Sequence, residues 1–257
     1  MSEQTTVDML KAMRFSAMAE ELRRQMESPD TYRQLSFEER LALLTNAEWT
    51  KRQNNKVERC IREAHLALPH AAIEDIEYLP DRLLDKAEML RYSTCRFVED
   101  GRHIILKGAT GSGKTYIACA LGICACRRFK RVRYVRLPEL LDELSLAKAA
   151  GEFQKAIKQY KKADLLILDE WLLRSLSLDE AYDLLEVVEA RIERSTIFCT
   201  QYEPDGWYLR IGSEENQASP ITDSIMDRIK NNAYVVPLCG ESMRKRHGVA
   251  AEGGALG

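Results

Sequence analysis

The sequence predicts an α/β protein in which a parallel five-stranded sheet with flanking helices follows a small all-α amino-terminal domain. Two patterns lead to this prediction. About the first 90 residues repeat apolar side chains at helical spacing and contain no convincing strand. From residue 102 onward, short apolar runs alternate with helical stretches, which is typical of parallel strands joined by crossover helices. We predict a helical domain over residues 1–75 and a second domain over residues 76–257, with a disordered tail from residue 247.

The amino-terminal helical patterns end and begin at residues that favour helix termini. Residues 6–26 form one amphipathic pattern, and Pro29 ends it. Ser36, with Glu39 three residues later, forms the capping-box pattern that begins a second helix. On that second helix Trp49 lies among apolar positions, which favours packing in a core over stacking on bases.

Five short apolar runs supply the predicted strands. They are "HIILK", "VRYVRL", "LLILDE", "STIFCT" and "AYVVPL". Helical patterns separate them, so we expect crossover connections and helices on both faces of the sheet. The carboxyl ends of such strands share one edge, where open α/β sheets bind their ligands.

Composition restricts the functional classes. The formal net charge is −2, so any nucleic-acid surface must be a local patch. No apolar run approaches the roughly 18 residues of a membrane span, and "MSEQTTVDML" lacks the basic-then-apolar order of a signal peptide. The seven cysteines have no repeated C-x-x-C spacing, which favours core packing over a metal site or disulfides. We expect a cytoplasmic protein with no membrane partner.

One segment matches a phosphate-binding loop over its full length. The stretch "GATGSGKT" stands between a predicted strand and a helix, which is the context that this motif requires. Its glycines let several backbone N–H groups point at phosphate oxygens, and the positive end of the following helix adds to the attraction. The lysine would contact the β- and γ-phosphates, and the threonine would hold Mg²⁺. The predicted nucleotide-binding residues are Gly108, Ala109, Thr110, Gly111, Ser112, Gly113, Lys114 and Thr115.

A pair of carboxylates ends the third predicted strand. Asp169, at the end of "LLILDE", is expected to hold Mg²⁺ through water at the carboxyl edge of the sheet. Glu170 would polarise a water molecule for attack on the γ-phosphate. A capped strand with no catalytic role is the alternative, but a position behind a phosphate loop favours catalysis. The adjacent pair favours hydrolysis over phosphoryl transfer to a metabolite.

The order of strands and motifs resembles the AAA+ ATPases. In that class a polar residue at the end of the fourth strand senses the γ-phosphate, and Thr200 or Gln201 takes this place unless it only caps the strand. The segment "DSIMDRIKNN" resembles the one that carries an arginine finger, which implies that Arg228 acts on the ATP of a neighbouring subunit. "GESMRKR" places Arg244 at the position of a second, cis-acting sensor arginine. A surface ion pair is the alternative for each arginine.

Five stretches together span nearly the whole chain: "SFEERLALLTNAEWTKR", "GATGSGKTYIACALG", "LLILDE", "IMDRIKNN" and "GESMRKR". Through them the chain resembles the IstB-like helper ATPases of insertion-sequence transposition and, more distantly, the replicative helicase loader DnaC. The first of these stretches distinguishes the family from a general AAA+ module. Two departures stand out: Trp171 replaces a glycine-containing turn after Asp-Glu, and the fourth strand ends in Thr-Gln rather than Ser-Asn or Ser-Gln.

The resemblance implies a bacterial ATPase that binds ATP and Mg²⁺, oligomerises on duplex DNA and stimulates the transposase of the same insertion element. It implies composite ATP sites between subunits, with Lys114, Glu170 and Arg228 as catalytic residues and ADP and phosphate as products. A helicase loader on single-stranded DNA is the main alternative, because it would share every nucleotide-site residue. A small-molecule kinase would need a lid that "DEWLLRSLSL" does not resemble, and a clamp with negligible hydrolysis would not need the carboxylate pair.

Three basic clusters are candidates for contact with DNA. In the first, on the second predicted helix, Arg52, Lys56 and Arg59 share one face, which could line phosphates with salt-dependent affinity or be an ordinary solvated face. The second, "CRRFKRVRYVR", belongs to a loop that faces away from the nucleotide edge. The third, in "QYKKAD", follows the stretch where initiator-type AAA+ proteins carry an additional DNA-contacting helix. The predicted contacts are Lys51, Arg52, Lys56, Arg59, Lys161 and Lys162.

Overall fold

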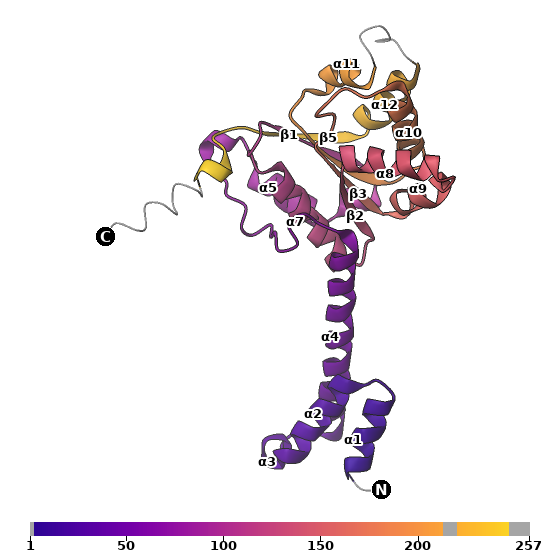
Figure 1. The fold of residues 1–257 in the computed structure, drawn as a ribbon. Helices are drawn as coiled ribbons and strands as arrows, with labels where there is room; N and C mark the ends of the chain where they lie inside the picture. Colours follow the sequence, from indigo (N-terminus) through magenta and orange to yellow (C-terminus); the bar gives the residue numbers. More distant parts are fainter. Residues whose placement is uncertain (1–2, 213–219, 247–257) are drawn as a thin grey trace, which may run out of the picture. The chain divides into compact units, whose positions relative to one another are not determined.

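The computed structural model describes residues 3–212 and 220–246, and its contacts divide the chain into two compact units (Figure 1). The units are Met1–Arg59 and Cys60–Gly257. This division precedes the boundary drawn from the sequence, because apolar side chains between Leu66 and Ile76 belong to the core of the second unit. The tail predicted from residue 247 lies outside the described residues.

The first unit contains short helices and most of one long helix. They are α1 (Glu3–Ala12), α2 (Ser16–Glu27), α3 (Pro29–Tyr32) and α4 (Phe37–Ala64), the last of which continues into the second unit. The single helix predicted over residues 6–26 is wrong, because Arg14 has a left-handed backbone (φ 64°) and separates α1 from α2. The Glu48 carboxylate on α4 then caps α2 by accepting hydrogen bonds from the amides of Ala17 (2.9 Å) and Met18 (3.3 Å).

The start of α4 has the predicted capping box. The Glu39 amide donates to Ser36 Oγ at 3.2 Å, and the Ser36 amide donates to Glu39 Oε2 at 2.7 Å. The prediction that Trp49 packs in a core is wrong, since this residue is 65% exposed. Neighbouring positions on a helix point in different directions, and here the inward one belongs to Glu48, which is buried.

The second unit contains the predicted five-stranded parallel sheet. Its strands are β1 (His103–Gly108), β2 (Val132–Arg136), β3 (Leu165–Asp169), β4 (Ser195–Thr200) and β5 (Ala233–Leu238). Their order in the sheet is β2-β3-β4-β1-β5, and every neighbouring pair is parallel. The predicted fold class is confirmed.

Helices cover both faces of this sheet, because side chains alternate along each strand (Figure 1). In β3, Leu165 and Ile167 face one core, and Leu166 and Leu168 face the other. The first core includes residues of α5 (Lys86–Ser93), α6 (Arg96–Glu99) and α7 (Lys114–Arg127). The second includes residues of α8 (Leu137–Ala149), α9 (Phe153–Lys162), α10 (Leu178–Glu189) and α12 (Pro220–Lys230). The short elements are η1 (Pro80–Arg82), η2 (Pro204–Trp207) and α11 (Tyr208–Ile211).

The strand order positions the predicted motifs. Because β4 lies between β1 and β3 and all three are parallel, the ends of these strands meet at one edge of the sheet. Lys107, just before the phosphate loop, pairs with Thr200 at the end of β4. The loop after β1, Asp169 and Gln201 therefore lie near one another although they are far apart in the sequence.

Within residues 3–212 and 220–246, no helix is long and apolar enough to cross a membrane. All seven cysteines are free, and five of them are buried, in agreement with the predicted core packing. In the same part of the chain, no group of three or more His, Cys, Asp or Glu residues is arranged to hold a metal ion.

Candidate functional site

The phosphate loop joins β1 to α7 and contains two residues that require glycine. Gly111 (φ 82°) and Gly113 (φ 94°) have the left-handed backbone that other residues rarely adopt. A Cβ at Gly111 would also lie 2.2 Å from Ser242 Oγ. The amide of Met243 donates to the Gly111 carbonyl oxygen at 2.9 Å, so the carboxyl-terminal segment packs directly on the loop.

Lys114 is held over the loop that contains it. Its Nζ donates to the carbonyl oxygens of Gly108 (2.7 Å) and Ala109 (2.8 Å). Burial lowers the pKa of Lys114, and the carboxylate of Asp169 opposes this effect. A bound phosphate would replace these neutral carbonyl partners with anionic ones.

Thr115 and Asp169 form the link between the loop and the end of β3. Thr115 Oγ1 donates to Asp169 Oδ2 at 2.7 Å, and the Glu170 amide donates to Asp169 Oδ1 at 2.8 Å. Asp169 is only 6% exposed, so three-dimensional packing fixes its carboxylate. A hydroxyl and a carboxylate in contact supply the oxygen ligands that Mg²⁺ prefers.

Tyr134, which was not among the predicted residues, also binds Asp169. Its hydroxyl donates to Asp169 Oδ2 at 2.9 Å from the middle of β2. Burial, together with the negative charge of Asp169, raises the pKa of Tyr134 far above its ordinary value, so it remains a donor. Tyr134 pairs in register with Ile167, two residues before Asp169. The sequence could have indicated this contact only if the pairing of β2 with β3 had been known.

Glu170 begins a turn in which Trp171 takes the place of the expected glycine. Glu170 has a left-handed backbone (φ 54°), a conformation that costs about 1–2 kcal/mol for a residue with a side chain. Trp171 is 1% exposed, its amide donates to the Cys199 carbonyl oxygen at 2.8 Å, and its ring packs on Phe198 and Trp207. This packing stabilises the turn without glycine. Glu170 Oε1 itself lies 3.7 Å from the guanidinium of Arg136.

A cavity of about 320 Å³ gathers most of the predicted residues. Its lining includes Lys114, Thr115, Asp169, Glu170, Gln201 and Arg244. Thr200 is not part of that lining: its buried hydroxyl donates to the Trp171 carbonyl oxygen (3.3 Å) and accepts from the Tyr202 amide (3.1 Å). Of the two candidates for a γ-phosphate sensor, Gln201 is therefore the one at the cavity.

Arg228 lies far from this cavity. It stands in the last turn of α12, where its guanidinium forms an ion pair with Glu189 Oε1 at 2.8 Å and donates to the Ser224 carbonyl oxygen. It lines a separate small cavity together with His103, the first residue of β1. Since β1 spans roughly 17 Å between His103 and the phosphate loop, Arg228 is out of reach of the nucleotide cavity of its own chain.

A second cavity, of about 140 Å³, adjoins the other side of the phosphate loop. Apolar side chains of Ile76, Tyr116 and Met243 line it beside Gly113. The buried Arg82 braces this region, because its guanidinium donates to the carbonyl oxygens of Ser112 (2.8 Å) and Glu77 (2.6 Å). No sequence pattern indicated Arg82, because it acts through backbone contacts from a distant segment.

Comparison with known proteins identifies the family. The family described as "IstB-like ATP binding protein" matches residues 8–251. The chain belongs to the IstB-like ATP-binding family.

Relatives of this IstB-like chain are named for insertion sequences. It is 34% identical to the insertion sequence ATP-binding protein y4pL of Sinorhizobium fredii, over 93% of this chain and 96% of that protein. It is 37% identical to the ATP-binding protein of insertion sequence IS1162 from Pseudomonas fluorescens, over 78% of this chain and 87% of that protein. AMPPCP-bound DnaA from Aquifex aeolicus shares the fold, with a TM-score of 0.56 and 18% identity over 75% of this chain and 57% of that one. The IstB-like chain is thus an ATP-binding protein with an AAA+ fold.

Residues of all three basic clusters of the IstB-like chain make internal contacts. In the first, Arg52 pairs with Glu48 at 2.8 Å, and Lys51 donates to Ser16 Oγ at 3.0 Å, so both hold the α1–α2 junction. The remaining predicted residues of this cluster, Lys56 and Arg59, are exposed. In the second cluster, Lys130 pairs with Glu99 (3.2 Å) and Arg131 with Asp164 (2.7 Å).

The third cluster lies on α9, which is amphipathic. Ile157 and Tyr160 are buried, whereas Lys155, Lys158 and Lys162 are exposed and share one face at spacings of three and four residues. Lys161 is half-buried and pairs with Glu186 of α10 at 3.6 Å.

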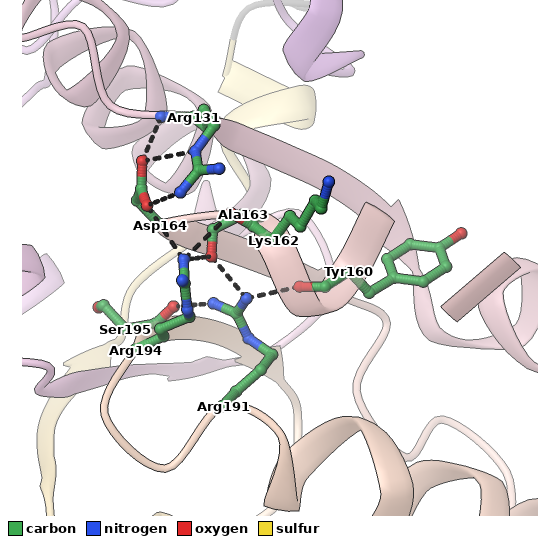
Figure 2. Close-up of polar contacts among 8 residues, drawn as sticks. All are labelled: Arg131, Tyr160, Lys162, Ala163, Asp164, Arg191, Arg194 and Ser195. Carbon is green, nitrogen blue, oxygen red and sulfur yellow. Dashed lines mark hydrogen bonds and ion pairs between the residues drawn. The ribbon is translucent and has the colours of Figure 1, made fainter. Parts of the chain in front are cut away.

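Two arginines that follow α10 hold the carboxyl end of α9 (Figure 2). Arg191 donates to the carbonyl oxygens of Tyr160 (2.6 Å) and Ala163 (2.7 Å), and Arg194 donates to that of Lys162 (3.0 Å). Arg191 is 2% exposed, and burial lowers its pKa to about 9. The negative end of the α9 dipole thus helps to balance a buried cation and ties α9 to the start of β4.

Proposed function

We propose that this IstB-like protein hydrolyses ATP, assembles on duplex DNA in its ATP-bound form and stimulates the transposase of the same insertion sequence. The hydrogen bond between Thr115 and Asp169 carries the proposal, since it joins the phosphate loop to the acidic end of β3. The names of its relatives, which refer to insertion sequences and ATP binding, supply the biological setting.

The larger cavity binds the phosphates of the nucleotide, and the smaller one binds its base. The loop amides and Lys114 bind the phosphates, and Arg244 approaches them from the carboxyl-terminal segment that packs on Gly111. The smaller cavity, with Tyr116 and Met243 on its wall, receives the base, because apolar side chains form much of its lining and it adjoins the loop at Gly113.

Thr115 and Asp169 would hold Mg²⁺, which neutralises charge on the β- and γ-phosphates when bound. Both supply oxygen atoms, and Tyr134 keeps the Asp169 carboxylate in place. Asp169 accepts hydrogen bonds at both of its oxygens, which limits its rotation and favours a fixed orientation toward the loop.

Glu170 orients the attacking water and accepts its proton. To do so it must leave Arg136, from which it is separated by 3.7 Å in this structure. Gln201 contacts the γ-phosphate from the end of β4. Arg228 stabilises the transition state in a neighbouring subunit, a role consistent with its distance from the cavity of its own chain. Hydrolysis therefore requires an oligomer.

The exposed face of α9 is the element best placed to contact DNA. Lys158 and Lys162 are exposed and form no ion pair within the described part of the chain, whereas Arg52, Lys130 and Arg131 of the other two clusters do. Two lysines on one helical face neutralise phosphates without reading bases, so the affinity is expected to depend steeply on salt and little on sequence.

The test uses the Glu170→Gln protein with ATP and Mg²⁺, offered duplex or single-stranded DNA of equal length and viewed by electron microscopy. We expect regular assemblies on duplex DNA that require ATP, and a hydrolysis rate reduced by about 10²- to 10⁴-fold. Lys114→Ala is the control, because it removes the phosphate contact and with it nucleotide-dependent assembly. Assemblies on single strands alone would favour the helicase-loader alternative, and wild-type turnover by Glu170→Gln would refute the role of Glu170.

A further inference from the structure

A cavity of about 460 Å³ in the second unit plays no part in the nucleotide site. Its lining comes from the segment before η1, from α5 and from the end of α7. The apolar part consists of Ile73 and Ile76, which are buried, and of Leu90, which is 50% exposed. A half-exposed leucine beside a hollow of this size marks a surface that can bury a further apolar side chain.

The polar part of the same cavity is cationic. Lys86, Arg127 and Arg128 line it, and Glu74 is the one carboxylate among its lining residues. Within the described part of the chain none of these four residues forms an ion pair; Arg128 donates to the Cys124 carbonyl oxygen and approaches Cys95 Sγ. The next two cations along the chain differ, since both are paired with carboxylates. The cavity thus concentrates positive charge that the described residues leave uncompensated.

A buried polar atom points to the same conclusion. Tyr78 lines the cavity, its ring lies 5.9 Å from Lys86 Nζ, and its hydroxyl is buried with no hydrogen-bond partner among the described residues. Leaving a buried hydroxyl unsatisfied costs about 1–3 kcal/mol. An occupant with acceptor oxygens would recover this cost in addition to contacting the cations.

We propose that this cavity binds an acidic peptide segment, anchored by an apolar side chain, from the transposase partner. Charge complementarity selects carboxylates, and Ile73, Ile76 and Leu90 select an apolar anchor next to them. The backbone of DNA would satisfy the cations but has nothing to fill the apolar part. The identity of the partner rests on the proposed function; the chemistry of the occupant rests on the cavity.

Occupation of this cavity would also affect the nucleotide. Ile76 lines both this cavity and the smaller one assigned to the base, so one short segment forms a wall of each. A peptide that immobilises this segment on one side restricts it on the other. We therefore expect the transposase to slow the release of ATP.

The experiment measures binding of the purified transposase of the same insertion sequence to the full-length protein with ATP. Arg127→Glu combined with Arg128→Glu should weaken binding by at least about tenfold, and the salt dependence of binding should decrease. Because Arg128 also contacts the chain itself, Lys86→Glu provides a second variant from the opposite wall. Both should bind ATP alone as the wild type does, but the transposase should no longer slow its release.

Arg96→Glu is the matched control, since Arg96 is a largely exposed arginine that does not line the cavity. Wild-type transposase binding by both charge-reversal variants would overturn the inference. So would a loss of DNA binding with transposase binding intact, because the cluster would then be a DNA contact. Failure of the wild-type protein to bind the transposase would instead contradict the proposed function itself.

Discussion

Tyr134 donates a hydrogen bond of 2.9 Å to the oxygen of Asp169 that also accepts from Thr115. The tyrosine thus reaches, from the neighbouring strand, the carboxylate that we propose holds Mg²⁺. In the proposed function Tyr134 is a positioning residue: its hydroxyl orients Asp169, whereas the phosphate loop and Lys114 would bind the nucleotide.

Tyr134→Phe keeps the ring and removes one hydrogen bond, which is worth about 0.5–1.5 kcal/mol. We expect the Mg²⁺ concentration that gives half of the ATP-dependent thermal stabilisation to rise by about 2- to 10-fold. Stabilisation by ATP without Mg²⁺ should not change. Tyr92→Phe is the matched control, because Tyr92 is also buried and donates to a carboxylate, Glu88, at 2.6 Å outside the nucleotide site. If the two variants needed the same Mg²⁺ concentration for half of the stabilisation, Tyr134 would have no part in binding Mg²⁺.

Mixing two inactive variants tests whether Arg228 acts across a subunit interface. Arg228→Ala should reduce hydrolysis by about 10³-fold or more, and Glu170→Gln, which should still assemble with ATP, by about 10²- to 10⁴-fold. Mixed oligomers should recover part of the activity, because some interfaces combine an intact Glu170 site with an intact Arg228. Lys230→Ala, in the same turn of α12, should remain active, since Lys230 pairs with Asp205. Mixtures as inactive as their components would contradict action in trans.

Removing the outward-facing lysines of α9 should weaken DNA binding uniformly across sequences. For Lys158→Ala combined with Lys162→Ala, the slope of log affinity against log salt should become shallower by about 0.9 for each phosphate that is no longer neutralised. Fluorescence anisotropy at several salt concentrations measures this slope. Lys130→Ala serves as the comparison, because Lys130 is paired with Glu99. An unchanged slope would contradict the contact between α9 and DNA. Lys56 and Arg59, the exposed cations of the first unit, would then be the next candidates.

His103 makes the stability of the second unit depend on pH. Burial and the nearby charge of Arg191 lower the pKa of His103 to about 4, and its Nδ1 accepts a hydrogen bond from the Thr196 amide at 3.1 Å. Its ordinary value is 6.5, so between these two values the unfolded chain binds a proton that the folded chain does not. The contribution of His103 is therefore complete above pH 6.5 and is lost as the pH falls toward 4.

Urea unfolding between pH 7 and 5 measures this loss, which should reach at most about 1.4 kcal/mol per pH unit. His103→Asn keeps an acceptor near the Thr196 amide and cannot titrate. The variant should be less stable at pH 7, but its free energy of unfolding should change less between pH 7 and 5. A variant as pH-dependent as the wild type would mean that other groups control the profile.

The sequence predicted the fold class and the nucleotide motifs because both are local patterns. Strand and helix periodicity identified all five strands, and the context of "GATGSGKT" identified the loop. Helix ends in the first unit were harder. The break at Arg14 depends on Glu48, which lies more than thirty residues away and caps the new helix from α4. The prediction that Trp49 packs in a core was wrong for the same reason. Which side of α4 faces inward depends on the distant segments that pack against this helix.

The sequence by itself located the phosphate-loop motif and the carboxylate that ends β3, because glycines, a lysine and an apolar run act over a few neighbouring positions. Only the tertiary structure decided that Tyr134 holds Asp169, that Gln201 rather than Thr200 faces the cavity, and that Arg228 lies beyond it. These relationships follow from the order β2-β3-β4-β1-β5 and from side-chain packing between distant segments. Local periodicity does not encode that order, because any of several arrangements of five parallel strands would bury the same apolar residues.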